Sequence, residues 1–141
     1  MKRFMICTVF AAASWAPLAI SANAQTLTAE IPFAFRAGST GMSAGNYEVG
    51  LVSHAANHIV LVKNTQTKQT VLIGNVAGTD PMKTWRAAGT PKLAFECVEN
   101  RCVLREIWTG DGPALKINSP KPGPDEAIRL TEIRMTRSPA F

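Results

Sequence analysis

After residue 25, the chain consists of short apolar runs separated by turn residues. In residues 29–35, Ile31, Phe33 and Phe35 alternate with other residues, which predicts a strand with one apolar face. Pro32 has no N–H to donate to a neighbouring strand, so this strand is expected at a sheet edge, or to begin there. Further strands are predicted over 46–52, 58–63 and 69–76, with connections over 36–45, 53–57 and 64–68.

The second half of the chain contains two segments that the pattern predicts to be irregular. Residues 78–91, which include Pro81 and Gly89, are expected to form a loop. Residues 109–125 form the longest irregular stretch, because prolines at this density stop both helices and strands.

The C-terminal segment 126–135 fits two interpretations. Its apolar residues spread widely around a helical wheel, whereas in a strand Ile128 and Leu130 share a face. The strand requires a bulge near Thr131 to bring the later apolar residues back to that face. The content of Ile and Thr favours the strand, and the helix remains open.

Consecutive strands joined by turns predict an all-β domain, an antiparallel meander that forms a β-sandwich or a small barrel. The predicted strands do not alternate with helices, so the pattern gives no indication of a parallel sheet. Residues 25–141 are long enough to bury the core of one domain.

The two cysteines in residues 93–108 fix the register of one predicted hairpin. If Glu99 and Asn100 form a two-residue turn, Cys97 lies opposite Cys102 at a position without ladder hydrogen bonds. The Cα atoms of such a pair approach to about 4.5 Å, which a disulfide accepts. This register places six residues on one face: Leu93, Phe95, Cys97, Cys102, Leu104 and Trp108.

Other interpretations of this cysteine pair are weaker. A redox-active pair normally has the Cys-x-x-Cys spacing at a helix N-terminus, and a zinc site requires four ligands where no second pair exists. The sequence therefore predicts a structural disulfide that faces the core.

The polar residues of the hairpin leave two open points. Glu96 lies diagonal to Arg101 and Arg105, so a cross-strand ion pair is expected there. Glu106 falls on the apolar side, which fits either a position at the sheet margin or a buried acid with a role. Glu99 is an imperfect turn residue, because it would require a positive φ.

The N-terminus predicts export. A basic start, an apolar segment over 4–20 and the sequence Ala22-Asn23-Ala24 form a signal peptide over 1–24, cleaved before Gln25. A membrane anchor is the alternative, but Pro17 interrupts an apolar run that is shorter than the roughly 20 residues a span requires. Cys7 lies near the start of this run, so it leaves with the signal. We expect a periplasmic or secreted protein with no membrane span in the mature chain.

The formal charge of +5 does not come from a basic cluster. Two of the charges, Lys2 and Arg3, belong to the predicted signal, and the remaining basic residues are scattered along the chain. A solvated surface explains this distribution better than nucleic-acid binding does, so no nucleic-acid partner is expected.

The search for chemistry yields no catalytic residues, no metal ligands and no cofactor. His54 and His58 flank a predicted turn, where their spacing does not bring them together for a metal. Trp85 and Trp108 lie in or beside loops, where an indole ring can stack on a sugar or anchor a partner. Together with Asp111, which lies in the turn Asp111-Gly112, they are the possible binding residues.

Two segments resemble an uncharacterised family of short exported bacterial β proteins. One is Ile31-Pro32-Phe33-Ala34-Phe35, followed by Ala44-Gly45-Asn46-Tyr47-Glu48-Val49, which matches the pattern I-P-F-x-F … A-G-x-Y-x-V. The other is the hairpin over 93–108, where the family usually has aromatic residues in place of the cysteines. The resemblance implies a β-sandwich-like fold, transfers no catalytic residue, and is weakest in the C-terminal part.

Three functional hypotheses follow. The first is an exported, non-enzymatic binding or interaction domain with an unknown partner in the cell envelope or exterior. The second is a binder of carbohydrates or small ligands that uses Trp85 and the 109–125 loop. The third is a hydrolase built on carboxylates or on His54 and His58. The sequence favours the first.

Overall fold

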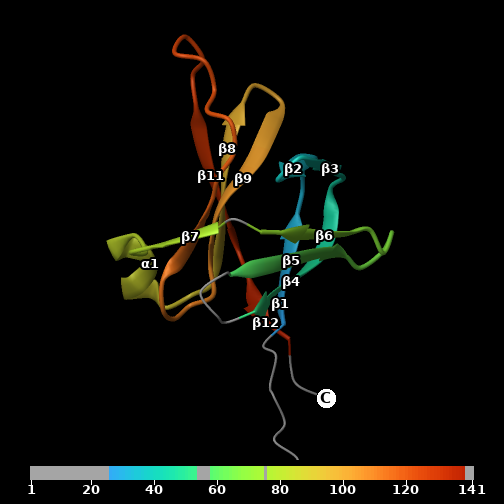
Figure 1. The fold of residues 1–141 in the computed structure, drawn as a ribbon, viewed down its shortest axis with the longest axis vertical. Coiled ribbons are helices and arrows are strands. Elements are labelled where there is room, and N and C mark those ends of the chain that lie inside the picture. Colours follow the sequence, from blue (N-terminus) through green and yellow to red (C-terminus); the bar gives the residue numbers. More distant parts are fainter. Residues whose placement is uncertain (1–25, 54–57, 75, 139–141) are drawn as a thin grey trace, which may run out of the picture.

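A computed structural model describes residues 26–53, 58–74 and 76–138. Two β-sheets pack against each other as a β-sandwich, and one short helix lies beside the larger sheet (Figure 1). This confirms the predicted all-β class and the sandwich, and the described strands form no closed barrel. The predicted signal peptide, His54 and most of the predicted turn over 53–57 lie outside the described residues.

The smaller sheet has five strands in the order β12-β1-β4-β5-β6, and each neighbouring pair is antiparallel. Its strands are β1 (Leu27–Ile31), β4 (Gly45–Ser53), β5 (Ile59–Asn64), β6 (Thr70–Ile73) and β12 (Thr136–Arg137). Because β12 pairs with β1, the two ends of the described chain lie side by side in this sheet.

The larger sheet has seven strands, five of them in the order β11-β8-β9-β10-β7. These are β7 (Val76–Thr79), β8 (Lys92–Val98), β9 (Arg101–Trp108), β10 (Ala114–Ile117) and β11 (Arg129–Arg134). The other two are β2 (Phe35–Ala37) and β3 (Thr40–Met42), which form a small hairpin. β2 pairs in parallel with the start of β9, so a meander describes only β4-β5-β6 and β8-β9-β10.

The predicted strand over 29–35 is broken at Pro32. β1 ends at Ile31 in the smaller sheet, and β2 begins at Phe35 in the larger sheet. Because Pro32 cannot donate to a ladder, it lies where the chain leaves one sheet for the other. The connection predicted over 36–45 also contains β3.

Two predicted loops contain regular structure. Residues 78–91 include the end of β7 and helix α1 (Lys83–Ala88), and residues 109–125 include β10. α1 ends at Gly89, whose φ of +64° allows its N–H to donate to the carbonyl of Trp85 at 2.9 Å. β10 is short and follows β9 after a turn, and its pairing with β7 comes from residues distant in sequence, so the local pattern did not reveal it.

The C-terminal segment is a strand, as its composition favoured, but without the expected bulge. β11 pairs with β8 in one continuous register from Arg129 to Arg134. Its inward side chains are therefore Thr131 and Ile133, which are half-buried, whereas Leu130 is 62% exposed.

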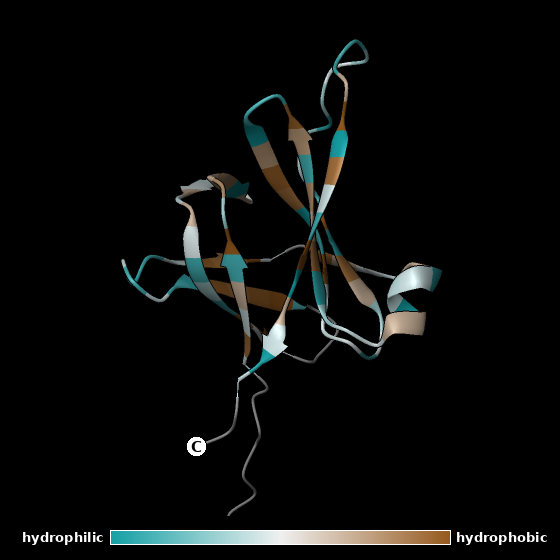
Figure 2. Ribbon diagram, turned by 180° about the vertical axis from the view of Figure 1, so that it is seen from behind, coloured by the Kyte–Doolittle hydropathy of each residue, from teal (hydrophilic) through white to brown (hydrophobic). Residues whose placement is uncertain are grey.

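The core lies between the two sheets. Figure 2 shows apolar and polar residues alternating along the strands, so each strand gives one side chain in two to the interior. Phe35 packs edge-to-face on both Tyr47 and Phe95, with ring centroids 5.2 and 5.3 Å apart, and these rings join strands of both sheets. Tyr47 is fully buried and its hydroxyl donates to the carbonyl of Ser43.

Candidate binding groove at the hairpin end of the larger sheet

The hairpin of β8 and β9 has the predicted register near its turn. Cys97 pairs with Cys102, the flanking pair is Val98 and Arg101, and Glu99 has a φ of +54°. The cysteines form a disulfide with the Cα atoms 4.0 Å apart, and both side chains are buried toward the core. The disulfide thus fixes the end of the sheet that carries the groove described below.

A bulge further along β9 explains why Glu106 did not fit the predicted pattern. The register shifts between Ala94 and Phe95, so Arg105 is an extra residue and Glu106 lies opposite Ala94. Ile107 then takes the core position opposite Leu93. Glu106 and Trp108 consequently lie on the outer face of the sheet, and the prediction that Trp108 shares the disulfide face is wrong.

The two tryptophans form a small second core instead of an open binding surface. Helix α1 places Trp85, which is 0% exposed, against Trp108, and the rings stack with centroids 6.5 Å apart. Trp85 Nε1 donates to Glu132 Oε1 at 2.9 Å, and Trp108 Nε1 donates to the carbonyl of Gly112 at 3.1 Å. Neither indole has a free face on which a sugar could stack.

Asp111 lies in an exposed turn directly after Trp108. The hydroxyl of Thr109 contacts the Asp111 carboxylate at 3.2 Å and donates to its carbonyl at 3.2 Å. These contacts assign Asp111 to the turn. Of the three predicted binding residues, the structure brings together only Trp85 and Trp108, and they form a core instead of a binding site.

Glu106 lies opposite Ala94, which belongs to the second core. Burial raises the pKa of its carboxyl, while a hydrogen bond from Thr79 and the charge of Lys116 act in the opposite direction. Thr79 Oγ1 lies 3.5 Å from Glu106 Oε1, and Lys116 is the β10 residue opposite Glu106 in the strand register with β9. Within the described ranges, no group of three or more His, Cys, Asp or Glu residues is arranged to hold a metal.

A groove of about 460 Å³ lies at the other end of this outer face, beside the hairpin turn. We call it the hairpin groove. Val98 and Val103 contribute to it from β8 and β9, Phe35 and Met42 from the β2–β3 hairpin, and the proline-rich segment 118–126 from the opposite side. A second cavity of about 450 Å³ adjoins it and shares Arg36, Val103 and Pro120.

Arg105 holds the proline-rich segment on the sheet. Its Nε donates to Glu96 Oε2 at 2.7 Å, which confirms the ion pair expected from the register. Its two terminal nitrogens donate to the carbonyls of Ser119 at 2.8 Å and Pro120 at 2.6 Å. One half-buried guanidinium, placed by the bulge, therefore joins β8, β9 and the segment.

The far end of the segment is held by Glu126. Its carboxylate pairs with Arg101 at 3.3 Å and accepts the N–H of Gly123 at 3.2 Å. Arg101 is largely exposed, so its ion pair with Glu126 stabilises the segment less than the contacts of Arg105 do.

The groove carries an excess of positive charge. Its two acidic residues, Glu96 and Glu126, are paired with Arg105 and Arg101, whereas its remaining cations, Arg36 and Lys121, form no ion pair among the described residues. Arg36 donates to the carbonyl of Ser39 at 3.0 Å, which orients it within its own hairpin.

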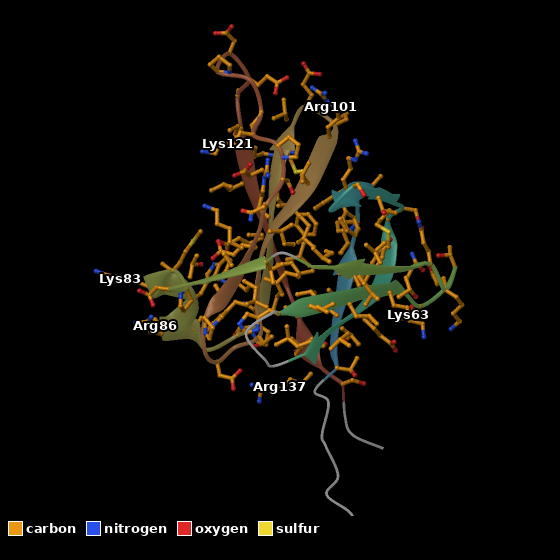
Figure 3. All side chains as sticks on the ribbon, viewed as in Figure 1. Lys63, Lys83, Arg86, Arg101, Lys121 and Arg137 are labelled. Atoms are coloured by element: carbon orange, nitrogen blue, oxygen red, sulfur yellow. A yellow bond between two sulfur atoms is a disulfide. The ribbon has the colours of Figure 1, made fainter. Side chains whose placement is uncertain are left out.

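The other labelled basic residues lie elsewhere. Figure 3 shows Arg101 and Lys121 at the hairpin end, Lys83 and Arg86 on α1, and Lys63 and Arg137 in other parts of the molecule. The six basic residues labelled there are spread over the molecule, which agrees with their scattered positions in the sequence.

Sequence reasoning missed most of the groove. Arg36 and Lys121 approach the hairpin only because β2 pairs with β9 and the 118–126 segment returns across the sheet. The available signal was the run of alternating prolines at 120, 122 and 124, which marks an extended segment but not the surface it meets.

Comparisons of the chain with protein-family models, with curated proteins and with solved structures found no match. In the part of the chain that the structure describes, no helix is long and apolar enough to cross a membrane.

Proposed function

We propose that this protein is an exported, non-enzymatic interaction domain of the cell envelope or exterior, and that it binds an acidic segment of a partner protein in the hairpin groove. The observation that carries the proposal is the groove itself, whose apolar residues are accompanied by two cations, Arg36 and Lys121, that have no acidic partner among the described residues. The predicted signal peptide and the disulfide support an oxidising compartment outside the cytoplasm.

The walls of the groove are fixed before any partner arrives. The Cys97–Cys102 disulfide closes one end of the hairpin, and Arg105 joins the sheet to the segment opposite. A surface that is already ordered loses less conformational entropy on binding. Such pre-organisation suits a binding site better than a moving lid.

The chemistry of the groove favours a partner with both apolar and acidic groups. Val98 and Val103 offer apolar area, and Arg36 and Lys121 supply charge at its border. Buried apolar contact contributes affinity, whereas border charges raise the association rate and select the partner. An acidic peptide segment with one or two apolar side chains meets both conditions.

The test is capture from an envelope extract with three forms of the mature, oxidised protein. The groove variant carries Arg36→Glu and Lys121→Glu, and the control variant carries the same charge change at Lys63→Glu and Lys83→Glu. We expect proteins that the wild type and the control retain and the groove variant loses, followed by direct titration of the identified partner.

Equal capture by all three forms would show that retention is nonspecific or lies elsewhere, and would overturn the groove as the binding site. Loss of capture in both variants would attribute retention to net charge alone, with the same consequence.

A further inference from the structure

The outer edge of the larger sheet is formed by β11, and all six of its residues pair with β8. Within the described residues no strand forms a ladder with its other side, although β1 lies beside its last residues, where the chain continues into β12. Figures 1 and 2 both show β11 at the margin of its sheet. An edge strand presents a row of backbone N–H and C=O groups without partners, which a further strand can use.

The residues that face this open side can be identified. Just beyond the paired region, the N–H of Met135 donates to the carbonyl of Pro91 at 2.9 Å, so odd-numbered residues of this segment point their backbone groups toward β8. Because the direction alternates along an antiparallel pair, Leu130 and Glu132 point theirs to the open side, whereas Arg134 points toward β1, which pairs with β12 just beyond it.

The side chains along the edge combine apolar and positive character. Ile128 and Leu130 are 49% and 62% exposed. Arg129 and Arg134 are exposed and form no ion pair among the described residues. The carboxylate of Glu132 is already occupied, because it accepts from Trp85 at 2.9 Å and from Lys92 at 3.2 Å.

We infer that β11 receives an extended acidic segment of a partner protein as an added antiparallel strand. The partner's backbone pairs with Leu130 and Glu132, its acidic residues lie near Arg129 and Arg134, and an apolar side chain covers Leu130. Main-chain hydrogen bonds provide affinity in this mode, and alternate side chains provide specificity. The inference concerns a surface separate from the hairpin groove, and does not require that the groove be occupied.

A second copy of this chain offers the arginines of the edge no complementary charge. Even-numbered residues face the open side, so antiparallel pairing centred on Glu132 places this carboxylate opposite its own copy, and pairing centred on Thr131 places Arg129 opposite Ile133. Neither of these registers places an acidic residue opposite Arg129 or Arg134.

The molecule contains a matched control strand. β6 is the edge of the smaller sheet, and its Leu72 is 62% exposed, the same fraction as Leu130. The carbonyl of Gln69 accepts from the N–H of Asn64 at 2.8 Å, so odd-numbered residues face β5 and the N–H of Leu72 faces the open side. β6 itself carries no charged residue.

The test titrates the mature, oxidised protein with the blocked peptide Ser-Glu-Thr-Val-Thr-Val-Glu-Ser, and with the same peptide in which lysine replaces both glutamates. Leu130→Pro removes one N–H from the open side and leaves the ladder with β8 intact. We expect it to weaken binding of the acidic peptide about tenfold or more, as loss of a hydrogen bond and an apolar contact implies. Leu72→Pro should leave the affinity unchanged.

Two further measurements keep the inference falsifiable if Leu130→Pro does not fold. The acidic peptide should slow hydrogen exchange of the Leu130 and Glu132 amides. The double variant Arg129→Glu and Arg134→Glu should exchange the preference, so that it binds the lysine peptide.

Any of three results would overturn the inference: no binding of the acidic peptide, equal binding of the lysine peptide by the wild type, or binding that leaves those two amides unprotected. Sedimentation of the protein alone, which measures its oligomeric state, can give a fourth such result. A dimer that Leu130→Pro abolishes would assign the edge to a second copy.

Discussion

The outer face of the larger sheet is covered in different ways at its two ends. At one end, α1 places a fully buried Trp85 on Trp108, and the contact is apolar and closed. At the hairpin end, the proline-rich segment is held over the sheet mainly by Arg105 and Glu126, and a groove remains beside it.

The difference shows how one sheet supports both stability and recognition. Burial of large aromatic side chains gives a strong, nondirectional contribution that fills space. Hydrogen bonds and ion pairs fix a segment in position without filling the space below it, and their net contribution to stability is smaller. Substitutions at the two ends should therefore differ in magnitude and in what they change.

The largest effect is expected at the closed end. Trp85→Ala removes the side chain that joins α1 to the sheet, and leaves Glu132 without its indole donor. A substitution of this kind in a core costs about 3–5 kcal/mol, measured as the free energy of unfolding in urea. The matched control is Arg86→Ala, the exposed next residue of the same helix, which should change that value by less than about 0.5 kcal/mol.

If Trp85→Ala cost no more than its control, the second core would contribute nothing, and the contrast between the two ends would disappear.

The disulfide comes next in magnitude. Reduction of Cys97–Cys102 opens a short loop, and the chain-entropy model assigns about 2 kcal/mol to a ring of this size. We expect the urea midpoint to fall on addition of reductant, and the double variant Cys97→Ser and Cys102→Ser to be insensitive to it. Intact mass supplies the chemical check, since the chain must gain two hydrogens on reduction.

A mass that does not rise would mean that the disulfide is not formed in the isolated protein. The hairpin end would then be held by the contacts of Arg105 without the disulfide.

The prediction of this hairpin from sequence shows what local pattern can determine. The pairing of Cys97 with Cys102 followed from the turn and from the alternation, because both act over a few residues. The bulge at Arg105 was visible only as an acidic residue, Glu106, on a face that should be apolar. A bulge leaves no mark in the residue composition. Its position depends on how Ile107 and Trp108 fit two different cores.

The parts that could not be predicted are those made by residues far apart in sequence. Burial of Trp85 depends on a short helix that packs on a sheet formed by later strands. The groove depends on the parallel pairing of β2 with β9, and on a segment after β10 that returns over the hairpin. Such contacts reflect the tertiary fold, and the local periodicity of the sequence does not contain them.

Arg105 should have a smaller effect on stability than the disulfide and a larger one on the groove. Arg105→Ala removes the ion pair with Glu96 and two hydrogen bonds to segment carbonyls. For a partly exposed group of this kind we expect a loss of about 1–2 kcal/mol. Hydrogen exchange should also accelerate in residues 118–123, whereas α1 should not change.

The matched control is Arg101→Ala, whose exposed pair with Glu126 should contribute less than about 1 kcal/mol. Equal effects of the two arginine variants on stability and on exchange would show that Arg105 does not hold the segment in place.

The smallest effect concerns Glu106, at the closed end, and it appears as a pH dependence. Burial raises the pKa of this carboxyl in the folded protein above its ordinary value of 4.5. Below that value the carboxyl is protonated in both states and costs nothing. As the pH rises through 4.5 toward the raised pKa, the unfolded chain ionises first, so stability falls, and above the folded pKa the full cost is present.

Glu106→Gln keeps the shape of the side chain and removes the charge that the closed end disfavours. The variant should therefore match the wild type in acid and exceed it at neutral pH, and unfolding free energies from pH 3.5 to 8 measure the difference. Glu99→Gln, in the exposed hairpin turn, is the control and should change the unfolding free energy by less than about 0.5 kcal/mol. A Glu106→Gln variant less stable than the wild type at neutral pH would mean that Lys116 and Thr79 compensate the buried charge fully. The two ends of the sheet would then both rely on polar contacts, and the contrast between an apolar, closed end and a polar, open one would fail at this residue.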